Sequence, residues 1–208
     1  MGYYVNIHPE NPQHKQINNV ANVLKNGGIA IIPTDTVYAL ACDFSNGKAI
    51  ERMAQVKAMS ANKTKFSFVF KDLSQVSSYT KQFDTPTYKL LRKALPGPYT
   101  FILEASNTLA KAFKNKKKTV GIRVPKNNIT HDLCDRLGTP IAVTSILTDD
   151  DILEYPTDAS LLYDEFKDLV DVVVDGGIGG LIPSTIIDLT GPLPEVIRSG
   201  LGETDHLI

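Results

Sequence analysis

The apolar and polar positions of the chain alternate between two periods. Apolar residues between 17 and 24 recur at intervals of three and four, which predicts an amphipathic helix closed by Gly27 and Gly28. The run GIAII that follows predicts a buried strand. Further helices are predicted at about 46–57, 85–94, 129–137 and 157–168, and further strands in FSFVF, YTFIL, GIRVP, PIAVTSI, VDVVVD and STIIDLT. This alternation predicts an α/β fold with many parallel or mixed strands in its sheet.

Polar side chains concentrate where these predicted strands end. The stretch IIPTDTVYALACD at 31–43 reads as a strand entering a core, yet it carries Thr34, Asp35, Thr36 and Tyr38. Hydroxyl and guanidinium groups recur beside the later strands, at Arg123, Thr144, Ser145, Ser184, Thr185 and Arg198. One strand-end threonine is usually a turn residue. In open α/β sheets, however, the ligand crevice lies at strand ends, so the recurrence indicates a binding site.

Length and composition favour one soluble domain. At 208 residues and 42% hydrophobic the chain can bury one sizeable core, and we expect a single domain over 1–208. Its apolar runs are far shorter than the roughly 20 residues that span a bilayer, and MGYYVNIHPE does not read as a signal peptide. We therefore expect a cytoplasmic protein without membrane contact. Cys42, Cys134 and four scattered histidines lack the spacing of a disulfide framework or a zinc site.

Charge is divided unevenly along the chain. Residues 1–120 contain 17 Lys and Arg against 7 Asp and Glu, whereas residues 121–208 contain 5 against 16. This asymmetry indicates either a basic surface for an anionic partner or two complementary faces of one fold. The densest basic run, at 111–118, is either a solvated loop or a nucleic-acid contact, and no arginine or aromatic residue lies among its lysines to stack on bases.

Three other motifs offer less. GGIGG at 176–180 resembles a phosphate loop, but a strand follows it instead of a helix, so we expect a turn. The aspartates at 149–151 lack the spacing of a calcium loop and are assigned no chemistry. Asp35 and Asp188 could form an acid/base pair or could take turn or cap roles, and the sequence does not place them together.

Seven motifs in order give the chain a family resemblance. They are PTDTVYALACD, Lys57 at the end of the next helix, PGPYTFIL, GIRVP, TS at 144–145, PSTIID and IRSG. Together they resemble the YrdC/YciO family of threonylcarbamoyl-AMP synthase-like proteins over roughly residues 13–202, with details closer to the YciO branch. The resemblance implies a twisted open mixed sheet with flanking helices and a basic concave cleft.

The resemblance also implies ligands and a reaction. Established members of the family condense L-threonine, bicarbonate and ATP, with Mg²⁺, into threonylcarbamoyl-AMP and pyrophosphate, as the first stage of a tRNA adenosine modification. Because the threonine carbamate itself attacks the α-phosphate, the protein need supply mainly positioning and charge stabilisation. On this resemblance the L-threonine site would contain Thr34, Thr36, Tyr38, Arg123 and Ser184. The nucleotide site would contain Lys57, Lys63, Thr119, Ser145 and Arg198.

Two departures from the synthase motifs leave the activity open. Where synthases carry Lys-x-Arg-Pro-x-x-Lys, Met59 replaces the arginine, and where they carry Ser-x-Asn, Leu147 replaces the asparagine. Each lost hydrogen bond to a charged group could cost about 1.5–3 kcal/mol, so nucleotide binding could survive where synthesis does not. The sequence is therefore compatible with a weak synthase or a reverse or hydrolytic enzyme, with a double-stranded RNA or tRNA-binding protein, and with a nucleotide sensor.

Overall fold

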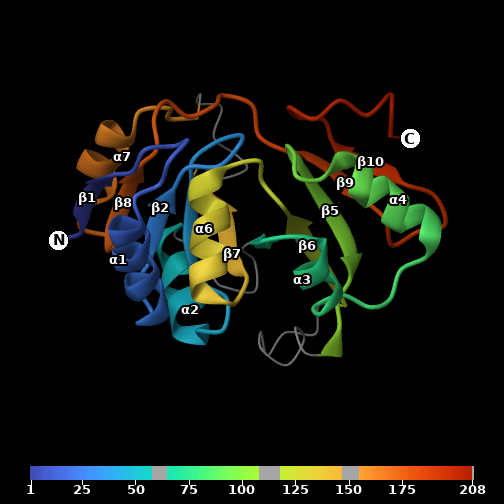
Figure 1. The fold of residues 1–208 in the computed structure, drawn as a ribbon, viewed down its shortest axis with the longest axis horizontal. Helices are drawn as coiled ribbons and strands as arrows, with labels where there is room; N and C mark the ends of the chain where they lie inside the picture. Colours follow the sequence, from blue (N-terminus) through green and yellow to red (C-terminus); the bar gives the residue numbers. More distant parts are fainter. Residues whose placement is uncertain (58–64, 108–117, 147–154, 208) are drawn as a thin grey trace.

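A ten-stranded mixed sheet runs through the computed structural model, which describes residues 1–57, 65–107, 118–146 and 155–207 (Figure 1). In space the strand order is β1-β8-β2-β3-β7-β4-β6-β5-β9-β10. The pairs β1–β8, β8–β2, β4–β6 and β5–β9 are parallel and the other neighbours antiparallel. The strands are β1 (Tyr3–Asn6), β2 (Ala30–Ile32), β3 (Ala39–Asp43), β4 (Ser67–Val69), β5 (Tyr99–Glu104), β6 (Thr119–Arg123), β7 (Ile141–Ser145), β8 (Val172–Asp175), β9 (Thr185–Asp188) and β10 (Glu195–Arg198). The predicted mixed α/β class is confirmed.

The described helices begin and end where the sequence supplies caps. They are α1 (His14–Lys25), α2 (Gly47–Val56), α3 (Leu73–Ser77), α4 (Thr85–Ala94), α6 (Asn128–Leu137) and α7 (Ala159–Phe166). The Asn46 side chain accepts the N–H of Ala49 at 3.1 Å and starts α2. Gly138, at φ +73°, ends α6, as a left-handed residue without a Cβ can do at little cost. All the helices predicted from periodicity are confirmed to within a few residues. Among the described elements, α3, β1, β3 and β10 were not predicted.

The interpretation of 31–43 as one strand is wrong. β2 ends at Ile32 and β3 begins at Ala39. The two strands are antiparallel, and Ile32 pairs with Ala39. Residues 33–38 form the connection, so the polar side chains of this stretch lie in a loop between two buried strands. The apolar residues on both sides concealed this boundary, because a short buried strand has no alternating pattern.

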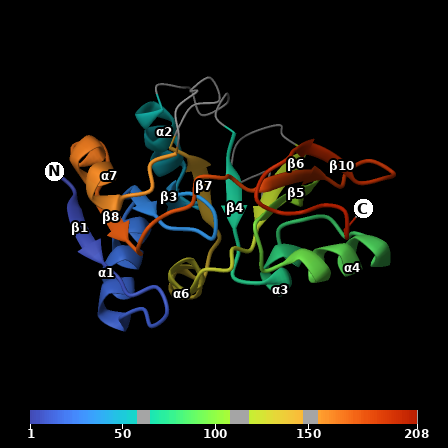
Figure 2. The ribbon, with the colours of Figure 1, turned by 90° about the horizontal axis from the view of Figure 1, so that it is seen from above.

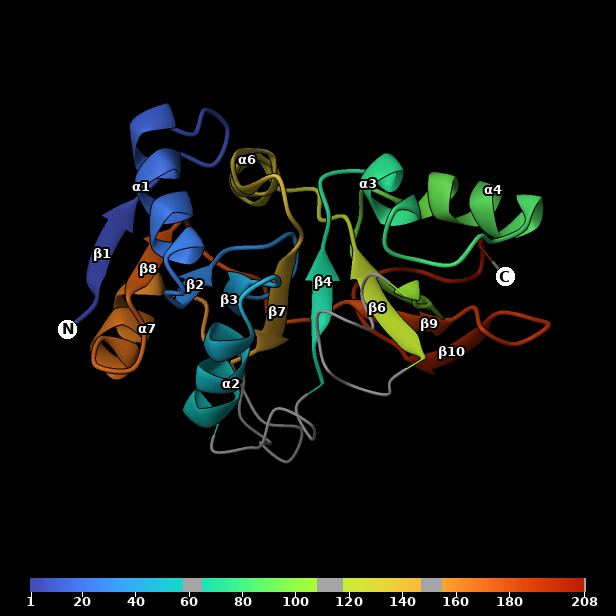
Figure 3. The same ribbon diagram turned by 90° about the horizontal axis from the view of Figure 1, so that it is seen from below.

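One face of the sheet is covered along most of its length. Helices α2 and α7 pack there against β2, β3 and β8, and helices α3 and α4 pack there against β5 and β6, in one continuous apolar cluster. The opposite face is covered over part of its length by α1 and α6, which bury a second cluster with β2, β3, β7 and β8. In Figure 3, α1 and α6 lie on one side of these strands, and α2 and α7 lie on the other.

Beyond β4, the second face of the sheet is no longer part of an apolar cluster. Val69 belongs to the second apolar cluster, which contains no residue of β5, β6, β9 or β10. We call this part of the second face the open face, and its residues are Thr119, Gly121 and Arg123 of β6, Thr100, Ile102 and Glu104 of β5, Ile186 and Asp188 of β9, and Glu195 and Arg198 of β10.

Twist turns each face of the sheet between its covered half and its open half. A twist of about 20–25° per strand accumulates to roughly 200° over ten strands, so one face points in opposite directions at the two ends. Figures 2 and 3 show this arrangement, with α1, α2, α6 and α7 gathered around the half that begins at β1, and α3 and α4 beside the half that ends at β10.

Candidate functional site

Arg123 forms the centre of a buried polar cluster on the open face. Its side chain is only 7% exposed, and its Nη2 lies 2.9 Å from Oδ1 of Asp35, whose side chain is 8% exposed. The same Nη2 donates to Oγ1 of Thr36 at 2.9 Å. Arg123 ends β6, whereas Asp35 and Thr36 lie in the loop 33–38. The contact therefore joins the open half of the sheet to the covered half.

The loop 33–38 is fixed by hydrogen bonds of its own. Oγ1 of Thr34 donates to the carbonyl of Val37 at 2.7 Å and accepts the N–H of Thr36 at 3.1 Å. The hydroxyl oxygens of Thr34 and Thr36 lie 3.1 Å apart. Oδ2 of Asp35 accepts the N–H of Lys126 at 3.0 Å. Two hydroxyls and one carboxylate are thus held beside the Arg123 guanidinium.

Ser184 and Arg198 extend the cluster across the next strands. The register places Thr100 opposite Ile186 and Ile186 opposite Arg198. The hydroxyl oxygens of Ser184 and Thr100 lie 2.8 Å apart, and Nη2 of Arg198 donates to the Ser184 carbonyl at 2.8 Å. The register of β10 shifts between Val196 and Arg198. This β-bulge turns Arg198 onto the open face, because without the extra residue its side chain would point to the other face.

The electrostatics of the cluster favour an anion. Burial lowers the pKa of Arg123, the Asp35 carboxylate raises that pKa, and the charge of Arg198 lowers it. The positive charges of the two guanidinium groups therefore repel each other, and the single carboxylate of Asp35 balances only one of them. The Nε atoms of both arginines are buried, and within the described residues neither has a hydrogen-bond partner. Buried N–H groups are rarely left unpaired, so these two make the cluster a candidate binding site.

The glycine segment 176–180 packs against the loop 33–38 and is bonded to Tyr38 at the end of that loop. The Tyr38 hydroxyl donates to the Gly177 carbonyl at 2.6 Å and accepts the N–H of Gly176 at 3.2 Å. Burial raises the pKa of Tyr38 to about 12. A Cβ on Gly180 would lie 2.3 Å from the Thr36 carbonyl oxygen, so only glycine permits this close approach. The segment is irregular, without the helix of a phosphate loop, and the N–H of Gly180 donates to the Thr36 carbonyl at 2.7 Å.

Lys57 and Ser145 form a second polar group. Nζ of Lys57, the residue after α2, donates to the Ser145 carbonyl at 2.8 Å and contacts its hydroxyl at 3.3 Å. Ser145 pairs with Ala39, directly after Tyr38. Thr119 is exposed and begins β6, four residues before Arg123, which corresponds to about 13 Å along a strand.

The predicted site residues are therefore divided between two places. The register through β4 puts Thr119 and Ser145 at one end of their strands. Arg123 lies near the other end, with Thr34, Thr36 and Ser184. Arg198, predicted from the resemblance as a nucleotide contact, lies with this second set rather than with Lys57. The structure thus brings the predicted threonine residues together, places Thr119 about 13 Å along β6 from Arg123, and joins Lys57 and Ser145 in a group of their own.

Several predicted features lie outside the described residues. Lys63, Met59 and Leu147 are among them, as are the aspartates at 149–151 and the lysines at 111–117. Within the described ranges, no group of three or more His, Cys, Asp and Glu could hold a metal ion. No helix in those ranges is long and apolar enough to cross a membrane.

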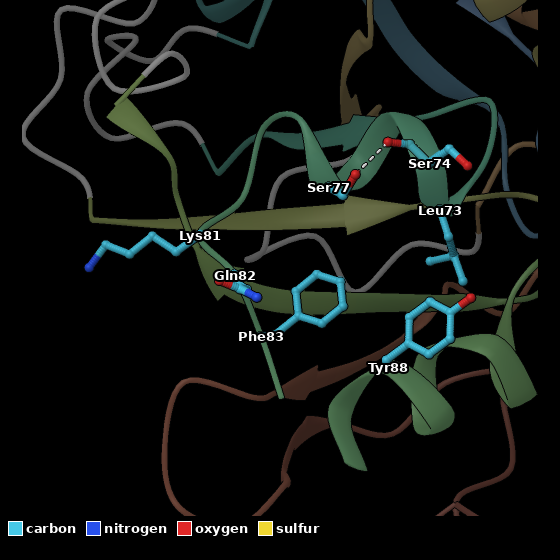
Figure 4. A pocket seen from close by; sticks show the side chains of 7 residues that line it. All are labelled: Leu73, Ser74, Ser77, Lys81, Gln82, Phe83 and Tyr88. Atoms are coloured by element: carbon cyan, nitrogen blue, oxygen red, sulfur yellow. Dashed lines mark hydrogen bonds between the residues drawn. The ribbon is translucent and has the colours of Figure 1, made fainter. Parts of the chain in front are cut away.

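A hollow of about 370 Å³ lies elsewhere, between α3 and α4 (Figure 4). Its lining residues are Leu73, Ser74, Ser77, Lys81, Gln82, Phe83 and Tyr88. None of the predicted site residues contributes to it. Lys81 is paired with Glu104 at 3.0 Å and the Ser77 hydroxyl donates to the Ser74 carbonyl, so the lining of the hollow has no pair of neighbouring guanidinium groups like Arg123 and Arg198.

Sequence reasoning missed two members of the cluster. Asp35 was considered only as an acid/base or turn residue, and its pairing with Arg123 joins positions 88 residues apart. The second missed member, Thr100, could have been found, since it alternates with buried Tyr99 and Phe101 and must therefore face the opposite side of the sheet.

Among the described contacts, Asp188 does not pair with Asp35. It takes the turn role that was the other interpretation, because its Oδ1 accepts from the N–H of Thr190 at 2.8 Å.

The fold and the cluster define an α/β protein with two neighbouring arginines on a partly uncovered sheet. Residues 22–200 match the Sua5/YciO/YrdC family model, which carries the description "Telomere recombination". The chain belongs to this family, and the resemblance indicated by its motifs is confirmed.

Relatives cover the chain to different extents. It is 35% identical over 205 residues to the Escherichia coli K12 protein YciO, covering 98% of each. The crystal structure of E. coli YciO has a TM-score of 0.91 over 100% of both chains, at 33% identity. The structure of P. abyssi Sua5 complexed with L-threonine has a TM-score of 0.85 at 25% identity, covering 95% of this chain and 57% of that one. A mouse threonylcarbamoyl-AMP synthase is 32% identical over 179 residues, and the match covers 61% of its length.

Proposed function

We propose that the protein binds L-threonine and ATP, or threonylcarbamoyl-AMP, in the cytoplasm. It would act there as a weak threonylcarbamoyl-AMP synthase or catalyse the reverse or hydrolytic reaction, linked to tRNA modification. The observation that carries the proposal is the cluster of buried Arg123, half-buried Arg198 and Asp35, in which two Nε–H groups have no partner among the described residues and two positive charges face one carboxylate. A planar guanidinium suits bidentate recognition of a carboxylate. The likeness to Sua5 complexed with L-threonine supports that amino acid as the ligand.

The hydroxyl groups around the arginines would orient the amino acid. Thr36 accepts a hydrogen bond from Arg123, and Ser184 lies between Thr100 and Arg198. On the nucleotide side, Lys57 and Ser145 would contact ATP together with Thr119. Arg198 lies with the threonine set, and its charge acts on Arg123, so it would contact the ligand close to the threonine carboxylate.

Magnesium would arrive with ATP. The described residues contain no carboxylate cluster for it, and Asp35 already accepts hydrogen bonds from Arg123 and Lys126. Mg²⁺ commonly keeps several waters and binds through substrate phosphates, so a site without a protein cage fits it. The bicarbonate would react with the threonine amine, and the protein would contribute positioning and charge stabilisation.

The test is to incubate the protein with ATP, L-threonine, bicarbonate and Mg²⁺ and to assay both pyrophosphate and the adenylate. We expect slow formation of both, and a large loss with Arg123→Gln. Arg52→Gln is the matched control, because Arg52 also forms an ion pair, with Asp171 at 2.6 Å, but lies on α2 away from the cluster. Equal activity of the two variants, or L-threonine binding that Arg123→Gln leaves unchanged, would refute the assignment.

A second candidate function is binding of double-stranded RNA or tRNA without synthase activity. The observation that favours it is the excess of Lys and Arg over Asp and Glu in residues 1–120, by 17 to 7. A protein that binds RNA but neither L-threonine nor ATP would fit this function. Binding of ATP without any turnover would instead fit a nucleotide sensor.

A further inference from the structure

Asp35 lies beside the guanidinium group that a ligand carboxylate would bind. Its Oδ1 is 2.9 Å from Nη2 of Arg123, and its side chain is 8% exposed. A carboxylate can accept about four hydrogen bonds, and Asp35 accepts one on each oxygen, from Arg123 and from the N–H of Lys126. An anion that approaches the Arg123 guanidinium therefore also approaches a fixed negative charge with unused acceptor capacity.

The consequence depends on the charge pattern of the ligand. A simple carboxylate on Arg123 would lie within a few ångströms of Asp35, and like charges in a poorly solvated site repel each other strongly. An α-amino acid carries an ammonium group one carbon away from its carboxylate. With the carboxylate on Arg123 and Arg198, that ammonium can lie beside Asp35, so that positive and negative groups alternate.

We propose that Asp35 makes the site selective for ligands that carry an ammonium group next to their carboxylate. This inference rests on the proposed function, which supplies L-threonine as the ligand, and goes beyond it by naming the residue that recognises the amino group. The hydroxyls of Thr34 and Thr36 carry no charge, so they would not distinguish acids with an amino group from acids without one. Asp35 is the charged group in the described cluster that distinguishes between them.

A purely structural role for Asp35 makes a different prediction. If Asp35 only fixed the Arg123 side chain and joined the loop 33–38 to Lys126, its replacement would weaken every ligand by a similar factor. A role in selectivity changes the ratio of two affinities, and that ratio does not depend on the fraction of folded protein.

The experiment compares L-threonine with 3-hydroxybutyrate, which lacks only the amino group, by calorimetric titration at one ionic strength. We expect wild-type protein to prefer L-threonine at least tenfold, and Asp35→Asn to lower that preference at least tenfold. Asp188→Asn is the matched control, because Asp188 is a strand-end aspartate that bonds only within its own turn, to Thr190. It should keep the wild-type ratio.

The outcomes separate this inference from the proposed function. Wild-type protein that binds neither compound refutes the L-threonine assignment and the inference with it. Wild-type protein that binds both equally refutes the inference alone, and so does an Asp35→Asn variant that keeps the wild-type preference. If Asp35→Asn does not fold, the wild-type comparison still decides, because equal affinities would exclude recognition of the amino group.

Discussion

The ion pair between Arg123 and Asp35 should stabilise the fold far more than an exposed pair of similar geometry. Its N–O distance of 2.9 Å almost equals the 3.0 Å of Lys81 and Glu104, whose side chains are 59% and 53% exposed. Coulomb's law at about 3 Å gives roughly 1.4 kcal/mol in water and about 6 kcal/mol at an effective dielectric constant of 20. The cost of desolvating the two charges offsets part of the larger value. Because the distances are similar, any difference in coupling energy between the two ion pairs should come from burial.

The expected magnitudes follow from what each substitution leaves behind. Arg123→Met removes the charge but keeps an unbranched side chain, and it leaves the Asp35 carboxylate buried with the Lys126 N–H as its remaining described partner. We expect a loss of about 3–5 kcal/mol in the free energy of unfolding, typical when one partner of a buried pair is removed. Asp35→Asn combined with Arg123→Met should recover about 2–3 kcal/mol relative to the sum of the single changes.

The assay is a double-mutant cycle measured by urea unfolding, with the m-value checked in all four proteins. The same cycle at Lys81 and Glu104 is the control, and its coupling should be below about 1 kcal/mol. If the Arg123–Asp35 coupling were no larger than that of the exposed pair, burial would not strengthen this contact. The electrostatic description of the cluster would then be wrong.

Three further predictions concern Tyr38, the synthase departures and the basic run. Because burial raises the Tyr38 pKa to about 12, its contribution to stability is present below pH 10 and lost as pH rises toward 12; Tyr38→Phe should flatten that decline by up to about 2 kcal/mol in unfolding free energy at pH 11.5. Met59→Arg with Leu147→Asn should raise pyrophosphate release more than tenfold and more than additively in log rate, and an unchanged rate with intact ATP affinity would place the difference elsewhere. If RNA binds, replacing the lysines at 116–118 should flatten the salt dependence of its affinity, and an unaltered slope would exclude that segment.

The pattern of the sequence predicted elements that have a strong local signal. Helices α2 and α6 have an Asn cap and a periodic apolar side, and strands such as β8 are continuous apolar runs. β10 escaped prediction because its residues are mostly exposed and carry no alternation. β3 escaped because it continues the apolar character of β2 across a short connection. Local pattern thus defines elements well, but it does not find the boundary between two buried strands.

Some residues of the Arg123 cluster were predictable from the sequence, but their hydrogen bonds were not. The rule that ligands bind at strand ends selected Thr36, Arg123 and Ser184 as candidates, and these three residues lie in one cluster in the structure. The pairing of Arg123 with Asp35 depends on the order of strands in space, which no local pattern contains. The bulge before Arg198 is similar, since one extra residue in β10 decides which side of the sheet that arginine faces.

The loop 33–38 has one consequence for the kinetics of recognition. Its ends are held by the pairing of Ile32 with Ala39, and its interior is held by bonds to Val37, Lys126 and Gly180. Ordering a free backbone costs about 1–2 kcal/mol per residue in conformational entropy, and here that cost is already met by folding. A ligand would therefore meet a preorganised template. Its association should not wait for closure of this loop, and its binding should show no heat-capacity signature of coupled folding.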